Sequence, residues 1–170
     1  MQNFKEKLTK INTFIFDMDG VLTDGKIMVM HGHDPIRNLN SKDGYAFQLA
    51  AKKGYKLFLL SGGNSLAVKE ILTRGGFTEI YMSQHDKNKC YKEMLIEHKL
   101  NPEEILYMGD DLPDHVVLKQ VGVATCPADA APEIKDICIY ISQKKGGEGC
   151  ARDVVEQTMR VRGDWEIANW

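Results

Sequence analysis

The sequence predicts an α/β fold, a Rossmann-like three-layer sandwich in which helices cover both faces of a mostly parallel central sheet. Short apolar segments alternate with helical segments along the whole chain, which is typical of such sheets. The apolar segments contain few polar residues, as expected of strands that are buried on both faces. The chain has 170 residues without an internal repeat or linker, so we expect one domain over residues 1–170.

The expected strands are runs of aliphatic and aromatic residues at positions 11–17, 57–60, 79–82, 105–108, 122–125 and 137–141. Helices are expected between them, at positions 43–53, 65–74, 87–99, 113–120, 130–135 and 149–161. Gly54 ends the first of these helices and Gly75 the second, because glycine favours the backbone conformation that stops a helix. Pro102 occupies a first helical turn or a capping turn.

Residues 26–39 are expected to form a β-hairpin that projects from the domain. Residues 26–30 read as one strand, residues 31–34 as a turn and residues 35–40 as the returning strand. The first strand carries four apolar side chains in a row, which are best buried against a neighbouring subunit: Ile27, Met28, Val29 and Met30. The alternative is that the hairpin folds against its own domain.

The composition is that of a globular protein, with 43% hydrophobic and 27% charged residues. The net charge of −2 gives no reason to expect nucleic acid or an anionic membrane as a partner. We see neither a membrane-spanning run nor a signal peptide, so a cytoplasmic enzyme is expected. The four cysteines are scattered and predict ordinary thiols rather than a zinc site, with disulfide pairing as the alternative.

Two aspartates, Asp17 and Asp19, follow the first strand directly. Residues two apart point to the same side of a strand, and the chain turns at Gly20, so both carboxylates can crowd one small space. Two close carboxylates repel and need a cation or a shared proton. Magnesium takes such oxygen ligands beside phosphate, and aspartates can serve as nucleophile and in proton transfer. The alternative is an acidic turn after a strand.

An acidic segment with three aspartates follows the fourth predicted strand: Asp110, Asp111 and Asp114. In parallel sheets, ligands bind at the carboxyl ends of the strands. Asp110 can complete a magnesium site with Asp17 and the backbone carbonyl of Asp19. Asp111 and Asp114 are better candidates for supporting or substrate contacts. The alternative is an acidic helix N-terminus, where aspartate complements the helix dipole.

Two further segments supply groups that bind phosphate. Ser61 follows an apolar strand and can donate its hydroxyl to a phosphoryl oxygen, while the N–H groups of Gly62 and Gly63 add donors. Lys87 begins a helix, and its ammonium can balance the phosphate and the aspartates. The alternatives are a glycine-rich turn with a serine cap and a solvated surface lysine. Together the four segments predict a phosphoryl-transfer site.

The order Asp-x-Asp-Gly, Ser-Gly, Lys and Gly-Asp-Asp-x-x-Asp resembles the haloacid dehalogenase superfamily of phosphohydrolases. The resemblance covers nearly the whole chain and implies a HAD-like fold, here without the cap domain that many members carry. It implies that Asp17 is the nucleophile that forms an aspartyl-phosphate, and that Asp19 protonates the leaving alcohol and then activates water. It further implies that Ser61 and Lys87 bind phosphate and that Asp17, the Asp19 carbonyl and Asp110 hold Mg²⁺.

Residues 20–25, 40–44 and 146–149 narrow the resemblance to superfamily members that dephosphorylate keto-deoxy sugar acids. Their substrates are 3-deoxy-D-manno-octulosonate 8-phosphate, in lipopolysaccharide precursor synthesis, or nine-carbon 9-phosphates on sialic-acid-like pathways. Those enzymes are homotetramers in which a hairpin and a C-terminal tail, here about residues 144–170, help close a neighbour's site. The resemblance implies these substrate contacts: Asn40, Ser41, Lys42, Asp43, Gly44, Ser61, Gly62, Gly63, Arg74, Lys87, Asp111, Asp114 and Glu148.

Several positions depart from the octulosonate enzymes. Many of those carry arginine directly after Ser/Thr-Gly, and the nine-carbon enzymes tend to carry glutamate, whereas this chain has Gly63. Gln48 and Ile71 stand where further arginines are common. A sugar carboxylate usually needs arginine, lysine or backbone donors. The candidate cations are Lys42, Arg74, Lys144 and Lys145.

Two other classes of protein compete with the phosphatase. A catalytically silent relative could act as a scaffold or regulatory module, but a scaffold does not need four charges that converge on one point. A receiver domain of the response-regulator kind also has an acidic pocket, but it does not need Asp19 at this spacing. Trp165 and Trp170 are either docking residues or part of a frayed end.

Overall fold

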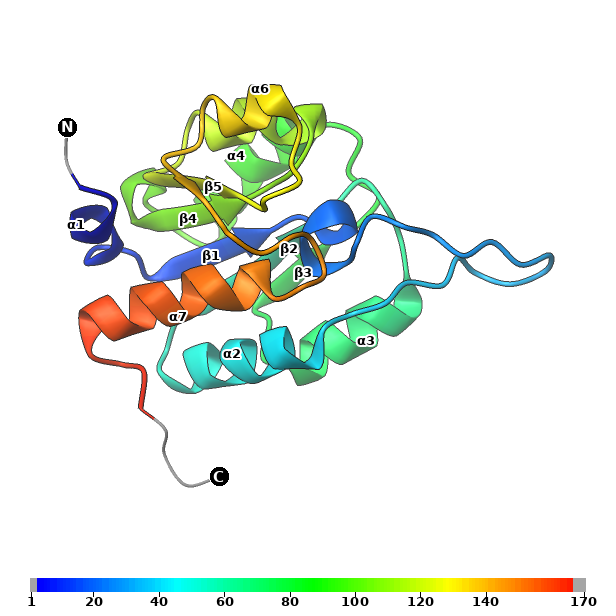
Figure 1. Cartoon of the computed structure of the whole chain (residues 1–170), viewed down its shortest axis with the longest axis horizontal. Helices are drawn as coiled ribbons and strands as arrows, with labels where there is room; N and C mark the ends of the chain where they lie inside the picture. The colour runs from blue at the N-terminus through cyan, green and yellow to red at the C-terminus, as the bar shows by residue number, and fades with distance from the viewer. Residues whose placement is uncertain (1–2, 167–170) are drawn as a thin grey trace.

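A single parallel sheet forms the centre of the protein, whose structure is a computed structural model that describes residues 3–166. Within these residues the sheet has six strands in the order β3-β2-β1-β4-β5-β6, and every neighbouring pair is parallel (Figure 1). The strands are β1 (Thr13–Phe16), β2 (Lys56–Leu60), β3 (Glu79–Tyr81), β4 (Ile105–Met108), β5 (Val123–Cys126) and β6 (Tyr140–Ile141). The predicted fold class is confirmed.

Helices cover both faces of the sheet, as predicted (Figure 1). One face carries α2 (Ser41–Lys52), α3 (Leu66–Arg74) and α7 (Cys150–Arg162). The other face carries α4 (Lys87–Glu97), α5 (His115–Leu118) and α6 (Pro132–Lys135). A short helix that was not expected, α1 (Phe4–Leu8), packs beside α7.

Side chains of the strands alternate between two hydrophobic cores. In β1, Phe14 and Phe16 face the core that includes Phe47 of α2, whereas Ile15 faces the core that includes Tyr91 of α4. Successive residues of a strand point to opposite faces, so burial on both faces requires an apolar residue at every position. This explains why the strands read as unbroken apolar runs in the sequence.

The strand β1 lies where the path of the chain across the sheet reverses. From β1 the chain runs outward to β2 and β3, then returns to the other side of β1 for β4, β5 and β6. Phe16, the last residue of β1, is paired with Leu59 on one side and Met108 on the other. The segments that follow β1, β2 and β4 therefore meet at one edge of the sheet, where a parallel sheet leaves a crevice for ligands.

Residues 26–39 project from the domain as predicted, but they form less β-structure than expected (Figure 1). One antiparallel bridge joins Met28 to Ile36, through two backbone hydrogen bonds of 3.1 Å each. The two strands predicted at 26–30 and 35–40 are therefore wrong. A two-stranded ladder without a packed face is only marginally stable, and most apolar side chains of this arm are exposed: Ile27, Met28, Val29, Met30 and Ile36.

Two elements in the second half of the chain, the strand predicted at 137–141 and the helix predicted at 113–120, are shorter than expected. The backbone N–H groups of Ile137 and Cys138 donate to the carbonyl of Ile134, which extends the turn of α6 and delays β6 to Tyr140. The helix predicted at 113–120 divides into a 3-10 turn, Leu112–Asp114, and α5.

The end of the described chain packs on the domain. Trp165 lies edge-on to Tyr45 with ring centroids 6.0 Å apart, and the guanidinium of Arg152 lies over its ring. Trp170 lies outside the described residues. Of the helices described, none combines the length and apolar character needed to cross a membrane.

Candidate active site

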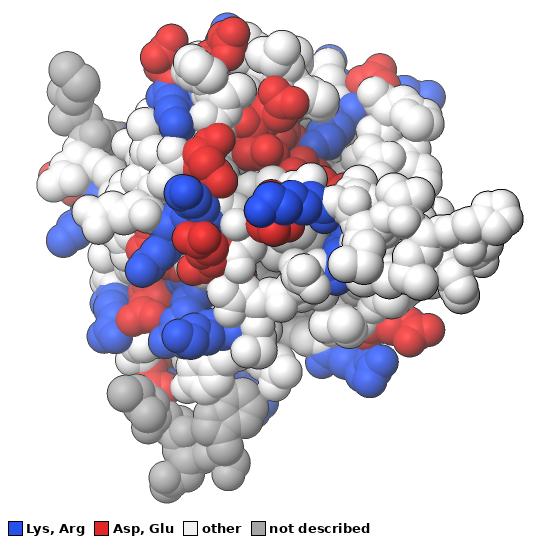
Figure 2. Space-filling model, turned by 45° about the vertical axis from the view of Figure 1, so that its right-hand side comes forward, with Lys and Arg blue, Asp and Glu red and all other residues white. Residues whose placement is uncertain are grey.

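An open cleft of about 440 Å³ lies at the carboxyl edge of β1, β2 and β4. Figure 2 shows acidic side chains gathered in a hollow on this face of the molecule, beside the projecting arm. The cleft brings together all four predicted segments, which contribute Asp17, Asp19, Ser61, Gly62, Gly63, Lys87, Asp110, Asp111 and Asp114. Residues from four separate parts of the sequence thus converge on one space.

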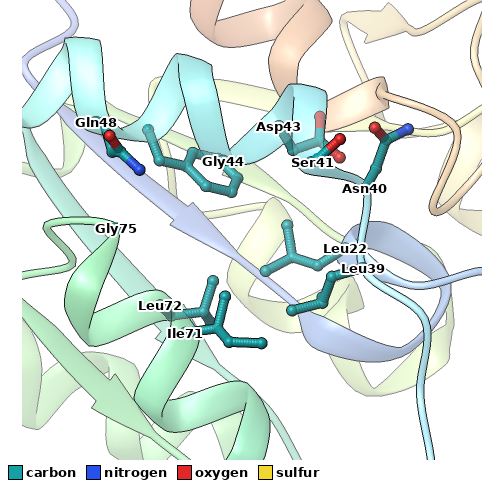
Figure 3. Close-up of a pocket in the computed structure, with 11 residues that line it drawn as sticks. Leu22, Leu39, Asn40, Ser41, Asp43, Gly44, Gln48, Ile71, Leu72 and Gly75 are labelled. Carbon is teal, nitrogen blue, oxygen red and sulfur yellow. The ribbon is translucent and has the colours of Figure 1, made fainter.

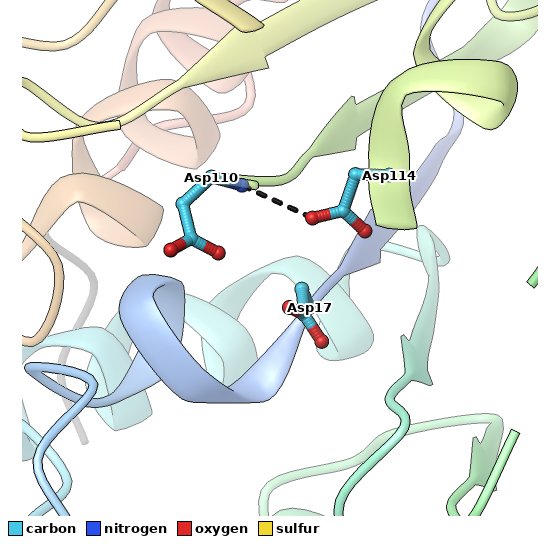
Figure 4. Close-up of side chains that lie close together, drawn as sticks. All are labelled: Asp17, Asp110 and Asp114. Carbon is cyan, nitrogen blue, oxygen red and sulfur yellow. Dashed lines mark hydrogen bonds between the residues drawn. The ribbon is translucent and has the colours of Figure 1, made fainter. Parts of the chain in front are cut away.

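Three aspartates form the centre of the cleft (Figure 4). Oxygen atoms of Asp17, Asp110 and Asp114 all lie within 4.8 Å of one another. The backbone N–H of Asp17 donates to the carbonyl of Met108 at 3.0 Å, so the sheet itself fixes Asp17 beside the end of β4. Oδ1 of Asp110 is buried and has no hydrogen-bond partner among the described residues. A buried carboxylate oxygen without a donor is costly unless a cation neutralises it.

The crowding of these carboxylates changes their pKa values. Burial, and then the neighbouring charge of Asp114, raise the pKa of Asp17 to about 7, although Lys87 opposes the rise. Burial, and then the charges of Asp17 and Asp114, raise the pKa of Asp110 to about 8. Burial and mutual repulsion thus disfavour the ionised forms of both carboxylates.

Asp17 and Asp110 are suited to hold a divalent cation, and Asp114 is less suited. Oδ1 of Asp114 accepts from Lys87 at 2.6 Å and from the Tyr107 hydroxyl at 2.5 Å, and Oδ2 accepts from the backbone N–H of Asp110 at 3.1 Å. Its oxygens are thus already used. Magnesium prefers a few carboxylate oxygens beside phosphate, which the partnerless oxygen of Asp110 and the nearby carboxylate of Asp17 offer.

Gly20 makes room for this pair of carboxylates. Its backbone has a φ of +90°, a conformation that side chains other than glycine rarely adopt. A Cβ atom at this position would overlap the carboxylate of Asp110. The glycine that follows the two aspartates is therefore required both for the turn and for the space next to Asp110.

Lys87 is held between two carboxylates. Its Nζ lies 2.9 Å from Oδ1 of Asp17 and 2.6 Å from Oδ1 of Asp114, and its side chain is 5% exposed. Burial alone would lower the pKa of Lys87, but the charges of Asp17 and Asp114 outweigh burial and raise it. The ammonium therefore stays charged at the position where a phosphate would meet Asp17. The alternative of a solvated surface lysine is wrong.

The loop after β2 presents hydrogen-bond donors to the same cleft. Oγ of Ser61 is buried and accepts from the backbone N–H of Gly63 at 3.1 Å, which leaves the hydroxyl hydrogen for an oxygen in the cleft. The backbone N–H of Ser83 donates to the carbonyl of Gly63, and that of Gln84 to the carbonyl of Ser61, each at 3.0 Å. These bonds fix the loop against the segment that leads to Lys87.

Asp19 lines the same cleft and binds an arginine that the sequence analysis did not consider. Nε of Arg37 donates to Oδ1 of Asp19 at 2.7 Å, and Nη2 donates to Oδ2 at 3.0 Å. Arg37 comes from the projecting arm, yet its side chain is 4% exposed. Thr23 also donates to Oδ1 of Asp19, at 3.2 Å. The assignment of the Asp19 carbonyl to a metal stays a prediction.

Gly63 leaves the space that the Asp19–Arg37 pair occupies. A Cβ atom at position 63 would lie 2.9 Å from Oδ2 of Asp19, 3.2 Å from Nη2 of Arg37 and 2.8 Å from the terminal methyl group of Met18. All three distances are shorter than ordinary contacts. The absence of a side chain at Gly63 and the presence of Arg37 are therefore linked features of this chain.

The loop at residues 40–44 lines a different pocket, shown in Figure 3. This pocket, of about 250 Å³, lies between α2 and α3, and it includes Asn40, Ser41, Asp43 and Gly44 beside apolar side chains. Oδ1 of Asp43 accepts from the backbone N–H of Arg152 at 2.7 Å, whereas Oδ2 is buried without a partner among the described residues. These side chains do not line the acidic cleft of their own chain.

The glycine-rich segment at 146–149 packs on the loop that follows β1. The backbone N–H of Gly147 donates to the carbonyl of Val21 at 3.0 Å, and Asn40 donates to the carbonyl of Gly147 at 3.1 Å. Glu148 is exposed. The segment thus supports the turn that carries Asp19 and Gly20 within the same chain.

The remaining predicted cations lie outside the cleft. Arg74 ends α3, its side chain is 77% exposed, and its partner is Glu70 at 3.6 Å. A helix that follows a parallel strand runs back to the opposite edge of the sheet, so the end of α3 is remote from the end of β2. The other predicted cations are exposed and do not line the cleft: Lys42, Lys144 and Lys145.

The fold and the cleft define a class of protein. A parallel sheet with a buried aspartate after its central strand, a second acidic segment after β4 and a lysine between them is typical of haloacid dehalogenase-like hydrolases. The model of the haloacid dehalogenase-like hydrolase family matches residues 72–152.

Three relatives specify the family within this class. The 3-deoxy-D-manno-octulosonate 8-phosphate phosphatase KdsC of Yersinia pestis is 30% identical over 163 residues, which cover 96% of this chain and 87% of that protein. A probable YrbI family phosphatase from Pseudomonas syringae pv. phaseolica has a similar structure, with a TM-score of 0.92, 30% identity and coverage of 96% and 93% of the two chains. The chain belongs to the haloacid dehalogenase-like phosphatases of the KdsC/YrbI family.

The third relative was solved with ligands. The 3-deoxy-D-manno-octulosonate 8-phosphate phosphatase of Moraxella catarrhalis, in complex with a magnesium ion, a phosphate ion and a KDO molecule, has a TM-score of 0.91 and 25% identity. The match covers 95% of this chain and 92% of that one.

Proposed function

We propose that this phosphatase releases phosphate from 3-deoxy-D-manno-octulosonate 8-phosphate, a step in lipopolysaccharide precursor synthesis, through an aspartyl-phosphate on Asp17. The observation that carries the chemistry is the position of Asp17. It lies at the switch point of the sheet, with Lys87 at 2.9 Å on one oxygen and Asp110 close by. A nucleophile needs this arrangement, because a phosphate dianion approaches an anionic carboxylate only where cations lie between them.

In the first step, a carboxylate oxygen of Asp17 attacks phosphorus, and the bond between phosphorus and the ester oxygen breaks. Asp19 gives a proton to that oxygen, which leaves as the sugar hydroxyl. Lys87, the Ser61 hydroxyl and the N–H groups of the loop at 62–63 bind the phosphoryl oxygens as negative charge shifts among them. The product is an acyl phosphate on Asp17.

In the second step, water attacks the phosphorus of the acyl phosphate, and Asp19 accepts the proton of the water. The bond between phosphorus and the Asp17 oxygen breaks, so inorganic phosphate leaves and the carboxylate is restored. Asp17, Asp110 and the Asp19 carbonyl would hold magnesium. When bound, magnesium supplies positive charge between phosphate and the carboxylates.

The family relationship supports a keto-deoxy sugar acid as the substrate. Two of the relatives above are named for 3-deoxy-D-manno-octulosonate 8-phosphate, and one of these two was solved with KDO and phosphate. A nine-carbon sugar acid 9-phosphate would suit the same chemistry, and Gly63 matches neither the arginine nor the glutamate expected for the two substrate classes. The choice between them needs a measurement.

The test is phosphate release with magnesium from the eight-carbon acid, nine-carbon acids and simple hexose phosphates, compared by kcat/KM. A preference of about 100-fold for the eight-carbon acid corresponds to about 2.7 kcal/mol of transition-state discrimination and supports the proposal. A flat profile, or a preference for nine carbons, contradicts the proposed substrate. Asp17→Asn serves as the control: equal inactivity of wild type and variant on every ester would contradict the phosphatase reaction itself.

We also propose a homotetramer in which the arm of residues 26–39 lies against a neighbouring subunit. Its apolar side chains are exposed in the single chain: Ile27, Met28, Val29, Met30 and Ile36. Contiguous exposed apolar side chains on a projecting arm favour burial in an interface. Light scattering gives the mass in solution, and Val29→Glu, at the most exposed of these positions, is expected to shift it toward the monomer. A wild-type monomer contradicts the proposal.

A further inference from the structure

Arg37 engages both oxygens of the carboxylate to which the proposed function assigns proton transfer. Its Nε and Nη2 atoms donate to the two oxygens of Asp19 at 2.7 and 3.0 Å. This bidentate arrangement is the strongest geometry available to an arginine and a carboxylate. Oδ1 also accepts from Thr23, so a leaving alcohol has to share Oδ2 with Arg37 or displace the guanidinium from it.

Arg37 cannot leave Asp19 without another anion to receive it. Its side chain is 4% exposed, although that of Asp19 is 27% exposed, and Nη1 is also bound, to the carbonyl of Asn64 at 3.2 Å. Separation of a buried ion pair is strongly unfavourable when one partner stays buried and uncompensated. A sugar hydroxyl does not replace the charge of Asp19, whereas a carboxylate does.

The cleft offers few other cations to a second anion of the substrate. Of the described side chains that line the cleft, Lys87 alone is a lysine or arginine. It is already shared between Asp17 and Asp114, where the proposed function has it bind the phosphate. Arg37 is not among the residues that line the cleft, but it is bound to Asp19, which is, and its Nη2 atom would lie 3.2 Å from a Cβ atom at Gly63. It is therefore a second cation beside the cleft, available to an anion of the substrate once it turns from Asp19.

The segment that carries Arg37 is able to move. It belongs to the arm of residues 26–39, whose two sides are joined by a single bridge between Met28 and Ile36 among the residues described. Segments held by few backbone hydrogen bonds open at low cost in free energy. A small displacement of the arm would turn the guanidinium from Asp19 toward a ligand in the cleft.

We propose that Arg37 is a specificity-determining residue that binds the carboxylate of the substrate's sugar part and, in doing so, releases Asp19 to act on the leaving oxygen. This rests on the proposed function in that it assumes a phosphate ester whose alcohol part carries a carboxylate. The exchange is between two carboxylates, so the guanidinium keeps an anionic partner throughout. Esters without a carboxylate leave Arg37 on Asp19 and are cleaved slowly.

The experiment compares matched esters on matched variants. The substrates are octulosonate 8-phosphate and its C1 methyl ester, together with a nine-carbon 9-phosphate and its methyl ester. The variants are wild type, Arg37→Met, Arg37→Lys and, as a control on the same arm, Lys26→Met, whose side chain is 87% exposed. The quantity measured is the ratio of kcat/KM for each acid to that of its own methyl ester. Thermal melting checks that each variant is folded.

We expect wild type and Lys26→Met to prefer the acids by about 100-fold or more, as for other sites built around a buried polar group. Arg37→Met is expected to lower kcat/KM for the acids by about 30-fold and to raise it severalfold for the methyl esters, because Asp19 is then free. Arg37→Lys restores part of the preference.

An equal loss on acids and esters in Arg37→Met would show that Arg37 only positions Asp19, and it would overturn the inference. A wild-type enzyme that does not distinguish acids from esters would overturn it as well. A different result would contradict the proposed substrate, namely a lack of preference between the eight-carbon acid and the nine-carbon acid. That result leaves the ratio of acid to ester, and therefore the test of Arg37, unaffected.

Discussion

The ammonium of Lys87 lies 2.6 Å from Oδ1 of Asp114, and the two side chains are 5% and 1% exposed. The Tyr107 hydroxyl donates to the same oxygen at 2.5 Å. The sequence suggested a supporting or substrate contact for Asp114. In the structure, Asp114 is the residue that holds the Lys87 ammonium beside Asp17, the proposed nucleophile.

We expect Asp114→Asn to lower kcat/KM for phosphate release by about 100-fold, because the ammonium loses the carboxylate that orients it toward the phosphate. The measurement is steady-state kinetics with saturating magnesium. Asp136→Asn, which changes an exposed carboxylate outside the cleft, is the control and should stay within about twofold of wild type, as surface substitutions usually do. An Asp114→Asn enzyme as active as this control would contradict the role of the ion pair.

Magnesium is expected to stabilise the protein through Asp110. Oδ1 of Asp110 is buried without a partner among the described residues, so a cation bound there removes an unfavourable charge. At 100 times its dissociation constant, a ligand adds about 2.7 kcal/mol to the free energy of unfolding. For a chain of this size that raises Tm by roughly 5–10 °C.

In Asp110→Asn, by contrast, the increase in Tm on addition of magnesium should disappear, while the metal-free variant melts at or above the temperature of metal-free wild type. Thermal unfolding with and without magnesium, in the presence of a chelator for the metal-free arm, measures both effects. A full magnesium shift in Asp110→Asn would show that the metal binds elsewhere.

Gly63→Ala is expected to disturb the Asp19–Arg37 pair. The added Cβ would lie 2.9 Å from Oδ2 of Asp19, so the carboxylate or the guanidinium has to move. We expect kcat/KM to fall by about tenfold and the free energy of unfolding by about 1 kcal/mol. Gly62→Ala is the matched variant, because its Cβ meets only the carbonyl of Gln84 at 3.6 Å, an ordinary contact. Equal effects of the two substitutions would contradict the prediction.

Asp43 should make the stability of the protein depend on pH. Burial raises the pKa of Asp43 to about 6, although the backbone N–H and the charge of Arg152 oppose the rise. In the unfolded chain the pKa is near 4. Between these two values the unfolded chain has lost a proton that the folded protein still holds, so this residue lowers stability as the pH rises from about 4 to about 6.

We expect Asp43→Asn to remove this loss. Its free energy of unfolding should exceed that of wild type by about 2–3 kcal/mol more at pH 7 than at pH 4. Urea unfolding of both proteins at the two pH values gives the difference. A pH dependence identical to that of wild type would show that the Asp43 carboxyl titrates normally in the folded protein.

The strands and the position of the cleft could be predicted from the sequence because both depend on local pattern. Phe14 to Phe16 form an apolar run that must be buried on both faces, and the polar residue that follows must lie at the sheet edge. The identity of the residues at that edge then indicates the chemistry. For Asp17 and Lys87 the structure adds the distances that the sequence cannot give.

Arg37 could not be predicted from the sequence because nothing local distinguishes it from a solvated arginine on a turn. Its burial depends on Asp19 and on the absence of a side chain at Gly63, which are 18 and 26 residues away along the sequence. A chain that lacks the expected arginine at position 63 is a signal to look for a replacement cation. That signal does not say where in the sequence the replacement lies.

The prediction of two strands in the arm was wrong for a related reason. Residues 26–30 have high strand propensity, but a ladder persists only when one face is packed, and the arm has no sheet beneath it in the single chain. The short β6 and the divided helix near residue 113 reflect local hydrogen bonds at Ile134 and Asp111 that compete with regular structure.

The arm of residues 26–39 interrupts the chain between β1 and α2 without contributing a strand to the sheet. Its length and its residues can therefore vary during evolution while Asp17, Lys87 and Asp110 keep their places. The substrate preference of such a protein can change through substitutions confined to this one short segment. The residues that perform the reaction and the residues that select the substrate thus lie in separate segments, which can evolve independently.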